Sequence, residues 1–497
     1  MKHTRIKYKS ILEYLIVFIG VFVFKAFTLQ GIAYNLCAED NSIFFIIGRE
    51  MLNGKVLYKE ITDQKGIYIF FIYVLANIIS QTSQVGVYII HSLLMCCVIG
   101  YLYNTLKIKI STLESMIITY FCIILICWTP VMTLNGYNED FILLCYIASL
   151  ISLYKHFDEH YSNYKVMVLH GVMCGIILNM KPNYILFYIP IAIHLIVTTL
   201  KDKKYITLRN NILSGLFGIT VANIPMIVYT VYNKCFIDMI HELYGNNSFD
   251  MYAEFSKSGI IGFVRDHLLI MLLIMVASVV TIFIYKKSMT ILYTSMSLFA
   301  LASALMSGRP YVHYTEVLLA FCIPTVAAIV HNLFKLKIKV ASVIVCISIA
   351  YIAVSYQNIY TSALYNLYIT EDANYGIYKI AELYRGEYSE FQDVVYIGYG
   401  GLMYYNTDIP VDKHPSLPCI QFDKYKDAVY YKENEIANNE PEMIVIQDGF
   451  MGLIQAKLSQ ETINIIQNNY TKVDEYLEKY NVHNCSFYIR NDLVKEG

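Results

Sequence analysis

The sequence predicts an all-α polytopic membrane domain of about 11 spanning helices plus a re-entrant or juxtamembrane element, followed by a C-terminal extracytoplasmic α/β domain. Three observations predict this fold class. The 497-residue chain is 57% hydrophobic and only 15% charged, against about 25% charged residues in ordinary soluble domains. Its apolar residues gather in runs long enough to cross a bilayer. Its lysines and arginines gather in alternate loops, as they do in the short cytoplasmic loops of membrane proteins.

The apolar runs predict the positions of the membrane spans. A helix needs about 20 mostly apolar residues to cross the hydrocarbon core. The expected spans are 11–30, 86–104, 113–132, 139–155, 166–180, 183–200, 212–232, 266–285, 289–307, 314–333 and 339–356. The apolar run 67–80 is shorter, so we expect it to be re-entrant or interfacial rather than spanning. The first run is long enough to span and no cleavage site follows it, so we expect an uncleaved helix.

The basic residues predict the orientation of the chain. If the N-terminus is cytoplasmic, every loop assigned to the cytoplasmic side carries lysine or arginine. A full span at 67–80 would move the later basic loops outside, so the charge pattern argues against it. We therefore expect a multi-pass protein of the cell membrane, with its N-terminus in the cytoplasm and its C-terminal domain extracytoplasmic.

The tail after the last expected span has a different pattern. Strand-like runs at 394–397, 443–446 and 486–489 alternate with helical stretches such as 454–468. The sequence thus predicts two domains, with a boundary between residues 1–356 and 357–497. No internal repeat of about 20–50 residues is evident, which argues against a repeat-built transporter.

Two acidic pairs stand at the outer ends of helices, on the same expected side of the membrane. Glu39 and Asp40 follow the first span, and Glu139 and Asp140 open the fourth. Ionisable groups at membrane depth are costly, so they are candidates for function. The alternative is that they are solvated loop carboxylates or helix N-caps. We take all four residues as candidate catalytic residues.

Candidate anion-binding residues lie on the same expected side. They are Lys65, Lys181, Arg309 and His313, with Lys25 near the outer end of the first span. A phosphate at a membrane surface needs such cations. The alternatives are that the basic side chains snorkel to the interface and that His313 is a buried structural histidine.

Several classes of site and partner are disfavoured by the sequence. The net charge of −1 leaves no basic surplus for nucleic acid. No CxxC pair exists, which argues against a structural zinc site. We expect no required metal, and a divalent cation is the alternative that stays open. No nucleotide-binding loop surrounds Gly400 and Gly401, so an enzyme that faces outward needs a lipid-carried donor.

The stretch from Asp40 to Gly66 resembles the GT-C glycosyltransferases, in particular the protein O-mannosyltransferase and aminoarabinose transferase superfamily. That family has an Asp, an aromatic residue four positions later (Phe44 here), an amphipathic helix ending near a Gly, and a Lys before a short helix (Lys65 here). Its two prolines after the Lys are replaced here by Gly66 and Ile67. Further matches are Glu139 or Asp140, Lys181, Arg309 with His313 and Tyr314, Pro324, and an outer α/β domain. The resemblance covers most of residues 1–356.

The resemblance implies a glycosyltransferase whose catalytic domain is 1–356. Such an enzyme transfers a hexose or pentose, with inversion, from a polyprenyl-phosphate donor to a lipid, cell-wall polymer or protein acceptor. It implies Asp40 as the general base for the acceptor hydroxyl, or as the residue that orients this hydroxyl, assisted by Glu139 or Asp140. The residues implied to hold the donor phosphate are Lys65, Lys181, Arg309, His313 and Tyr314. It also implies that membrane lipids surround the protein, and no nucleic acid is expected as a partner.

Two other classes stay open at this point. A lipid-linked polysaccharide polymerase or ligase also faces outward, but it relies on a large basic loop between late spans. Here the long early loop 31–85 carries the acids instead. A lipid or polysaccharide flippase or transporter predicts symmetric halves, midplane charges and no long outer tail.

Overall fold

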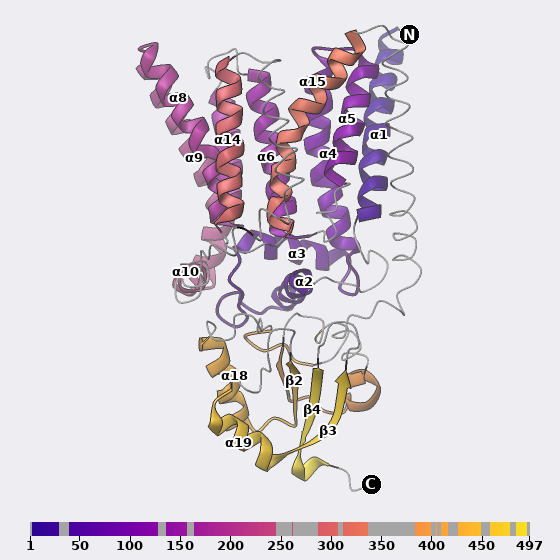
Figure 1. Cartoon of the computed structure of the whole chain (residues 1–497), viewed down its shortest axis with the longest axis vertical. Coiled ribbons are helices and arrows are strands. Elements are labelled where there is room, and N and C mark those ends of the chain that lie inside the picture. The colour runs from indigo at the N-terminus through magenta and orange to yellow at the C-terminus, as the bar shows by residue number, and fades with distance from the viewer. Residues whose placement is uncertain are drawn as a thin grey trace.

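The computed structural model describes most of the chain, in segments separated by gaps. The described residues are 2–28, 39–127, 136–156, 164–244, 261, 287–306, 312–335, 383–398, 404, 409–415, 426–448, 458–477 and 484–494. Figure 1 shows a bundle of long helices at one end and a small sheet with its helices at the other. The first helix begins at the end of the bundle far from the sheet.

Long apolar helices form the bundle. They are α1 (Lys2–Thr28), α4 (Val85–Lys107), α5 (Thr112–Cys127), α6 (Asn138–His156), α7 (Tyr164–Leu178), α8 (Ile189–Lys201), α9 (Tyr205–Tyr232), α14 (Lys287–Leu305) and α15 (Cys322–Lys335). Two 3-10 helices lead into bundle helices: η2 (Pro182–Tyr188) precedes α8, and η3 (Val312–Phe321) precedes α15. Pro182 opens η2, a position where its missing N–H has no helical partner to lose.

The lengths and apolar compositions of the described helices are those expected of a membrane protein. Five helical segments among the described residues are long and apolar enough to cross a bilayer: Val85–Lys107, Pro182–Lys201, Tyr205–Tyr232, Ser288–Leu305 and His313–Asn332. Each span expected between 11–30 and 212–232, and those at 289–307 and 314–333, overlaps a helix of the bundle. The expected spans 266–285 and 339–356 lie outside the described residues, so the total of about 11 stays a prediction.

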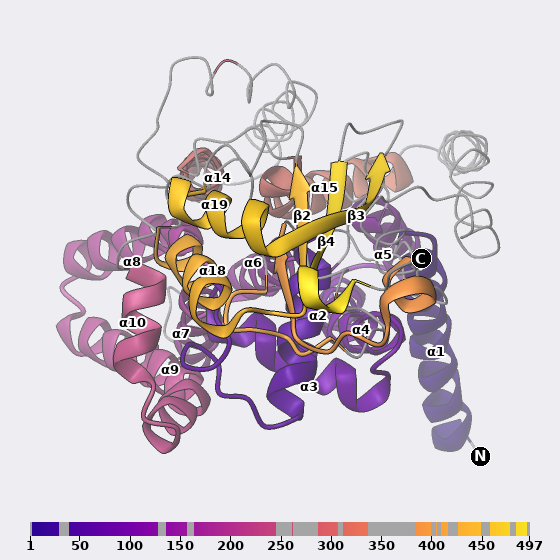
Figure 2. The ribbon, with the colours of Figure 1, turned by 90° about the horizontal axis from the view of Figure 1, so that it is seen from below.

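Two shorter helices lie across the end of the bundle that faces the sheet, as Figure 1 shows. They are α2 (Glu39–Leu52) and α3 (Ile67–Ile79). At about 1.5 Å per residue, the 13 residues of α3 reach well short of the hydrocarbon thickness of a bilayer. The apolar run 67–80 therefore forms a short transverse helix in the fold, and its position relative to the membrane stays a prediction. The amphipathic α10 (Phe236–Tyr244) follows α9 and lies beside its end in Figures 1 and 2.

Helices α7 and α9 pack with their backbones in contact. A Cβ on Gly171 would lie 2.1 Å from the carbonyl oxygen of Gly215, and a Cβ on Gly218 would lie 2.3 Å from that of Val168. Small residues permit this approach, which gives membrane helices close van der Waals contact.

The sheet has four strands in the order β1-β2-β4-β3. The strands are β1 (Val394–Ile397), β2 (Met443–Asp448), β3 (Tyr470–Leu477) and β4 (Asn484–Arg490). Strands β1 and β2 are parallel, whereas β4 is antiparallel to both β2 and β3. The helices around it are α18 (Lys426–Asn439), α19 (Gln460–Asn469), the π-helix η4 (Tyr384–Tyr388) and the 3-10 helix η8 (Asn491–Leu493). The predicted strand runs lie in β1, β2 and β4, while the boundary and outer location of a separate domain stay predictions.

Alternate residues of the strands enter two different cores. Tyr396 and Val445 join a continuous cluster of buried apolar side chains that extends into the helical bundle. Ile397 and Ile446 join a second cluster with residues of α18 and α19. Both faces of β1 and β2 are thus buried, which explains why these strands read as uninterrupted apolar runs.

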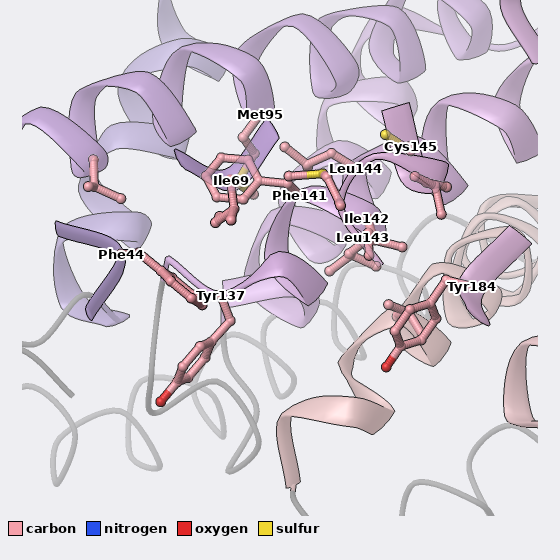
Figure 3. Close-up of a cluster of buried hydrophobic side chains, with 14 of the residues drawn as sticks. Phe44, Ile69, Met95, Tyr137, Phe141, Ile142, Leu143, Leu144, Cys145 and Tyr184 are labelled. Atoms are coloured by element: carbon pink, nitrogen blue, oxygen red, sulfur yellow. The ribbon is translucent and has the colours of Figure 1, made fainter. Parts of the chain in front are cut away.

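The core beside the transverse helices is rich in aromatic side chains. Figure 3 shows Phe44 of α2, Ile69 of α3, Met95 of α4 and Phe141 of α6 among the residues of this cluster. The ring of Phe44 meets that of Phe70 edge to face, with 5.8 Å between centroids. This packing holds α2, the helix that begins with Glu39 and Asp40, against α3.

Candidate active site

The candidate residues lie where the transverse helices meet the ends of the bundle helices. Asp40 is the second residue of α2 and is partly exposed, and Lys65 lies just before α3. The other described candidates stand at helix starts: Glu139 and Asp140 in the first turn of α6, Lys181 directly before η2, and His313 and Tyr314 in η3. Glu39 begins α2, but its side chain lies outside the description, as does the whole of Arg309.

Backbone contacts bring these separate segments together. The amide of Gly66 donates a hydrogen bond to the carbonyl oxygen of Met180 at 3.1 Å, which joins the residues after Lys65 to the turn that carries Lys181. The hydroxyl of Tyr73 in α3 donates to the carbonyl oxygen of Gly136 at 3.0 Å, just before α6. The loop before α3, the start of α6 and the start of η2 therefore form one neighbourhood.

Glu139 and Lys181 form a buried ion pair in this neighbourhood. Lys181 Nζ lies 2.5 Å from Glu139 Oε1, and their side chains are 9% and 3% exposed respectively. The hydroxyl of Tyr184 lies 3.3 Å from the same Oε1 atom. Lys181 Nζ also lies 3.8 Å from the centre of the Tyr314 ring, within range of a cation–π interaction. The ammonium group is thus held in place by a carboxylate and an aromatic face.

Asp63 is an acid of this site that was not among the predicted residues. Its Oδ1 accepts a hydrogen bond from the backbone amide of Lys65 at 2.9 Å and lies 3.7 Å from Lys65 Nζ. Burial raises the pKa of Asp63, the Lys65 ammonium opposes that rise, and the nearby Asp40 carboxylate adds to it. Asp40 and Asp63 therefore lie close enough to repel each other. The sequence signal that could have identified Asp63 is an acidic residue two positions before Lys65, in the same loop that was expected to lie outside.

His313 lies among the charged residues of the site. Its ring stacks on that of Tyr137, with centroids 4.7 Å apart and planes at 22°, and meets Tyr314 edge to face. Electrostatic interactions link it to Glu139, Lys181, Asp40 and Lys65. His313 therefore connects the Glu139–Lys181 pair with the group formed by Asp40, Asp63 and Lys65.

Asp140 points away from that group, although it follows Glu139 directly. Its Oδ1 lies 3.9 Å from Lys25 Nζ inside the bundle, and its Oδ2 accepts a hydrogen bond from the amide of Gly136. Gly136 has a φ of +108°, which favours glycine. Glu316 of η3 is fully buried and interacts with Asp140. Glu316 was not predicted as a site residue, although an ionisable residue inside an expected span is a usable signal.

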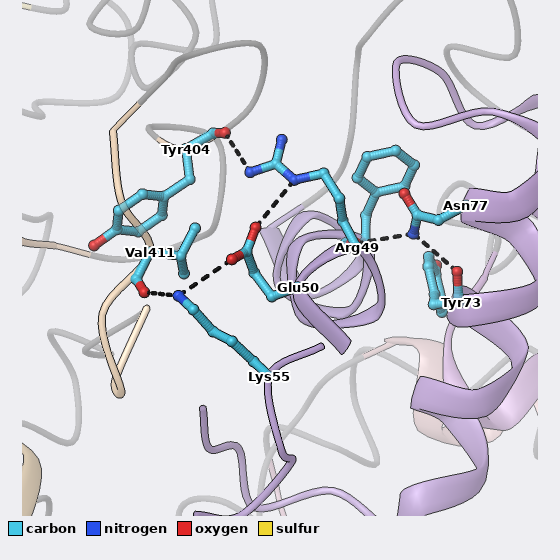
Figure 4. A network of polar contacts seen from close by, with 8 residues as sticks. Arg49, Glu50, Lys55, Tyr73, Asn77, Tyr404 and Val411 are labelled. Carbon is cyan, nitrogen blue, oxygen red and sulfur yellow. Dashed lines mark hydrogen bonds and ion pairs between the residues drawn. The ribbon is translucent and has the colours of Figure 1, made fainter. Parts of the chain in front are cut away.

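The segment that follows the sheet's first strand contacts α2 and the loop after it (Figure 4). Arg49 Nη2 donates to the carbonyl oxygen of Tyr404 at 3.1 Å. Lys55 donates to the carbonyl oxygen of Val411 and lies 3.1 Å from Glu50 Oε2. These contacts hold the C-terminal part against α2, the helix that carries Asp40.

A second contact lies next to the site itself. Thr62 Oγ1 lies 3.1 Å from His414 Nδ1, and the amide of Thr62 donates to the carbonyl oxygen of Lys413 at 2.8 Å. The neighbouring residue in the chain is Asp63, so the C-terminal segment 409–415 borders the group of acids. Across the described ranges, no three His, Cys, Asp or Glu side chains are grouped so that they could hold a metal ion.

The architecture and part of the sequence match known proteins. Residues 64–229 match the profile of the family described as dolichyl-phosphate-mannose-protein mannosyltransferase. The structure is similar to that of ArnT from Cupriavidus metallidurans bound to undecaprenyl phosphate, with a TM-score of 0.55 and 13% identity over 98% of this chain and 99% of that chain. The chain has the GT-C fold. The predicted resemblance to GT-C glycosyltransferases is therefore confirmed. The apolar helices and this fold together show a membrane protein.

Two further structures share this GT-C architecture. ArnT from Cupriavidus metallidurans in the apo state gives a TM-score of 0.51 at 12% identity, covering 99% of this chain and 100% of that chain. The Archaeoglobus fulgidus oligosaccharyltransferase tethered with an acceptor peptide gives 0.50 at 9% identity, covering 95% of this chain and 73% of that chain. No curated protein sequence matches the chain.

The arrangement on this GT-C fold combines two chemical capacities. The ammonium groups of Lys65 and Lys181, both of which interact with His313, can attract an anion. The partly exposed carboxylate of Asp40 stands beside them and can accept a proton.

Proposed function

We propose that this GT-C protein is a membrane glycosyltransferase, which transfers a hexose or pentose from a polyprenyl-phosphate donor to an extracytoplasmic acceptor. The observation that carries the proposal is the convergence of Asp40, Lys65, Glu139 and Lys181, from four separate segments, at one end of the bundle. The match of residues 64–229 to a family of mannosyltransferases supports it. So does the shared fold with ArnT, whose structure holds undecaprenyl phosphate.

The proposed donor site is the cationic part of the cluster. A polyprenyl phosphate presents its charge at the membrane surface, where ammonium groups bind it and stabilise the charge of the leaving phosphate. Lys181 is held by Glu139, and Lys65 by Asp63, so both cations are in position before the donor arrives. We assign Lys65, Lys181, Arg309, His313 and Tyr314 to this role.

Asp40 is proposed as the general base. Glu139 and Asp140 are almost fully buried and each pairs with a lysine, whereas Asp40 is partly exposed. Asp40 takes the proton of the acceptor hydroxyl while the acceptor oxygen forms a bond to the anomeric carbon. The bond from that carbon to the phosphate oxygen breaks, and its electron pair leaves with the polyprenyl phosphate. A single in-line displacement inverts the anomeric configuration.

The other acids are given supporting roles. Glu139 positions Lys181, and Asp140 belongs to a separate buried group with Lys25. Glu39 stays a candidate next to Asp40. The acceptor, a lipid, a cell-wall polymer or a protein, is proposed to approach from the side of segment 409–415, which borders Asp63.

The function is tested by incubating the purified protein in detergent with a panel of radiolabelled polyprenyl-phosphate sugars and candidate acceptors. Release of polyprenyl phosphate together with a single labelled sugar on the acceptor supports the proposal. Transfer of a preassembled sugar chain would indicate a polymerase or ligase. Movement of labelled lipid between the leaflets of a liposome, with no turnover of any donor, would indicate a flippase and overturn the assignment.

A further inference from the structure

Three ionisable side chains from three different helices meet inside the bundle. They are Lys25 of α1, Asp140 of α6 and Glu316 of η3. The side chains of Lys25 and Asp140 are 2% and 1% exposed, and Glu316 is 0% exposed. Ionised groups this deep cost several kcal/mol each unless they are paired, so their protonation must balance. The proposed transfer reaction uses none of the three directly.

The contacts of Asp140 are those of a carboxylate. Lys25 Nζ lies 3.9 Å from one oxygen, and the amide of Gly136 donates to the other. Glu316 is different. Within the part of the chain that the structure describes, no N–H or O–H group of another residue reaches either of its carboxyl oxygens as a donor. The group with which it interacts is the carboxyl group of Asp140.

A hydrogen bond between two carboxyl groups requires a proton on one of them. With both groups ionised, two negative charges would face the single positive charge of Lys25 in a dry environment. With a proton on Glu316, one carboxylate balances one ammonium. The other ionisable groups that interact with this cluster are His91 of α4 and Cys127 of α5, together with Glu139 beside Asp140.

We propose that Glu316 is a protonated positioning residue, whose O–H donates to Asp140 and thereby holds η3 against α6 beside the donor site. Its position in the chain gives this contact its effect. Tyr314 lies two residues before Glu316 and packs on Lys181, while Glu139 lies directly before Asp140 and pairs with Lys181. The Glu316–Asp140 contact therefore ties together the two elements between which Lys181 is held. This second part of the inference rests on the proposed function.

The protonation of Glu316 is tested by infrared difference spectroscopy on the purified full-length protein at neutral pH without any substrate. The wild type minus Glu316→Gln spectrum should show the C=O stretch of one protonated carboxyl group. The exposed Glu461, in the first turn of α19, provides the control, and wild type minus Glu461→Gln should show no such band. Absence of the band from the Glu316 difference would mean that Glu316 is ionised and would overturn the inference.

The positioning role is tested with the same variants in donor turnover. A glutamine amide can donate to Asp140 as a protonated carboxyl does, so Glu316→Gln should keep kcat/KM within about threefold of the wild type. Glu316→Leu removes the hydrogen bond, and we expect its KM for the donor to rise about tenfold or more. At alkaline pH the wild type should lose donor affinity as the shared proton leaves, whereas Glu316→Gln should not.

The outcomes separate the two proposals. An infrared band without turnover of any donor would refute the glycosyltransferase assignment and leave the protonated pair standing. A folded Glu316→Gln protein that loses more than about a hundredfold in kcat/KM would show that Glu316 works as a carboxylate, contrary to the inference.

Discussion

Gly66 leaves no space for a side chain beside Asn179, because a Cβ at residue 66 would lie 2.1 Å from the Asn179 carbonyl oxygen. Lys65 directly precedes this contact, and Lys181 follows it by two residues. The family that the sequence resembles has a proline at the position of Gly66. In this chain a glycine instead allows the loop before α3 to rest on the turn before η2. The spacing of the two site lysines depends on that approach.

We expect Gly66→Ala to push this loop away from the turn and separate Lys65 from Lys181. The neighbouring atoms are backbone, which cannot rotate aside, so the change should destabilise the protein by about 1–3 kcal/mol. It should also lower kcat/KM for the donor about tenfold or more. The control is Gly386→Ala, because an added Cβ there meets no atom within 4 Å. Equal thermal stability and turnover in the two variants would contradict the close-approach argument.

Replacing Lys181 should separate stability from activity. Lys181→Met leaves the buried carboxylate of Glu139 without its cation, which we expect to cost about 3–5 kcal/mol of stability. Adding Glu139→Gln removes the uncompensated charge and should restore most of that loss. The double variant should still fail to turn over the donor, because the phosphate has lost Lys181. A thermal-unfolding midpoint unchanged in Lys181→Met would show that the pair contributes nothing to the fold.

The environment of Asp63 should make the stability of the protein depend on pH, with a sign that follows from the raised pKa of Asp63. Burial raises the pKa of Asp63 in the folded protein, so folding favours its protonated form. Its contribution to stability is complete below the unfolded value of about 4 and is lost as pH rises through the raised pKa. The stability of the wild type relative to Asp63→Asn should therefore fall as pH increases from about 4 to 7.

Asp492 provides the opposite case for that measurement. A hydrogen bond from Arg490, at 2.7 Å, lowers the pKa of Asp492. Its contribution is present above the unfolded value of about 4 and is lost as pH falls through the lowered pKa, so the stability of the wild type relative to Asp492→Asn should rise with pH in this acidic range and stay level above it. Thermal-unfolding curves of the three proteins from about pH 2 to pH 7 cover both titrations, and a wild-type stability relative to Asp63→Asn that rises with pH would contradict the raised pKa of Asp63.

The contact between Thr62 and His414 should couple the C-terminal part to the site. Their side chains lie 3.1 Å apart, directly beside Asp63. Thr62→Val and His414→Ala should each reduce stability by about 0.5–1.5 kcal/mol, and the double variant should lose little more than either one. A double-mutant cycle measures this coupling, and strictly additive losses would mean that the two side chains act independently.

The long apolar runs made the helical part of the fold predictable, because length and composition alone decide whether a segment spans a bilayer. The span expected at 86–104 lies within α4, and the short run 67–80 forms α3. The resemblance to the GT-C superfamily was also predicted and is confirmed. Strand β3 was not predicted, because Thr471, Lys472, Asp474 and Glu475 interrupt its apolar residues, so it does not resemble the apolar runs of β1 and β2.

The pairing of the charged residues could not be predicted in the same way. The alternation of basic loops predicted that Glu139 and Lys181 lie on the same side of the bilayer. Their 2.5 Å contact, however, depends on how α6 meets η2. Glu139 and Asp140 looked equivalent in the sequence, yet the rotation of α6 gives them different partners. Glu316 was missed because a single carboxyl group inside an apolar run shows no partner until the helices are packed.

The most direct test of the central claim compares sugar transfer by the wild type, Asp40→Asn and Asp202→Asn. Asp202 is an exposed acid that pairs with Lys204 away from the site, so its variant reports any general effect of removing a carboxylate. The account predicts that Asp40→Asn lowers kcat about 10²–10⁴-fold with the fold intact, while Asp202→Asn transfers sugar at the wild-type rate. Transfer by Asp40→Asn within about threefold of the wild-type rate would contradict it.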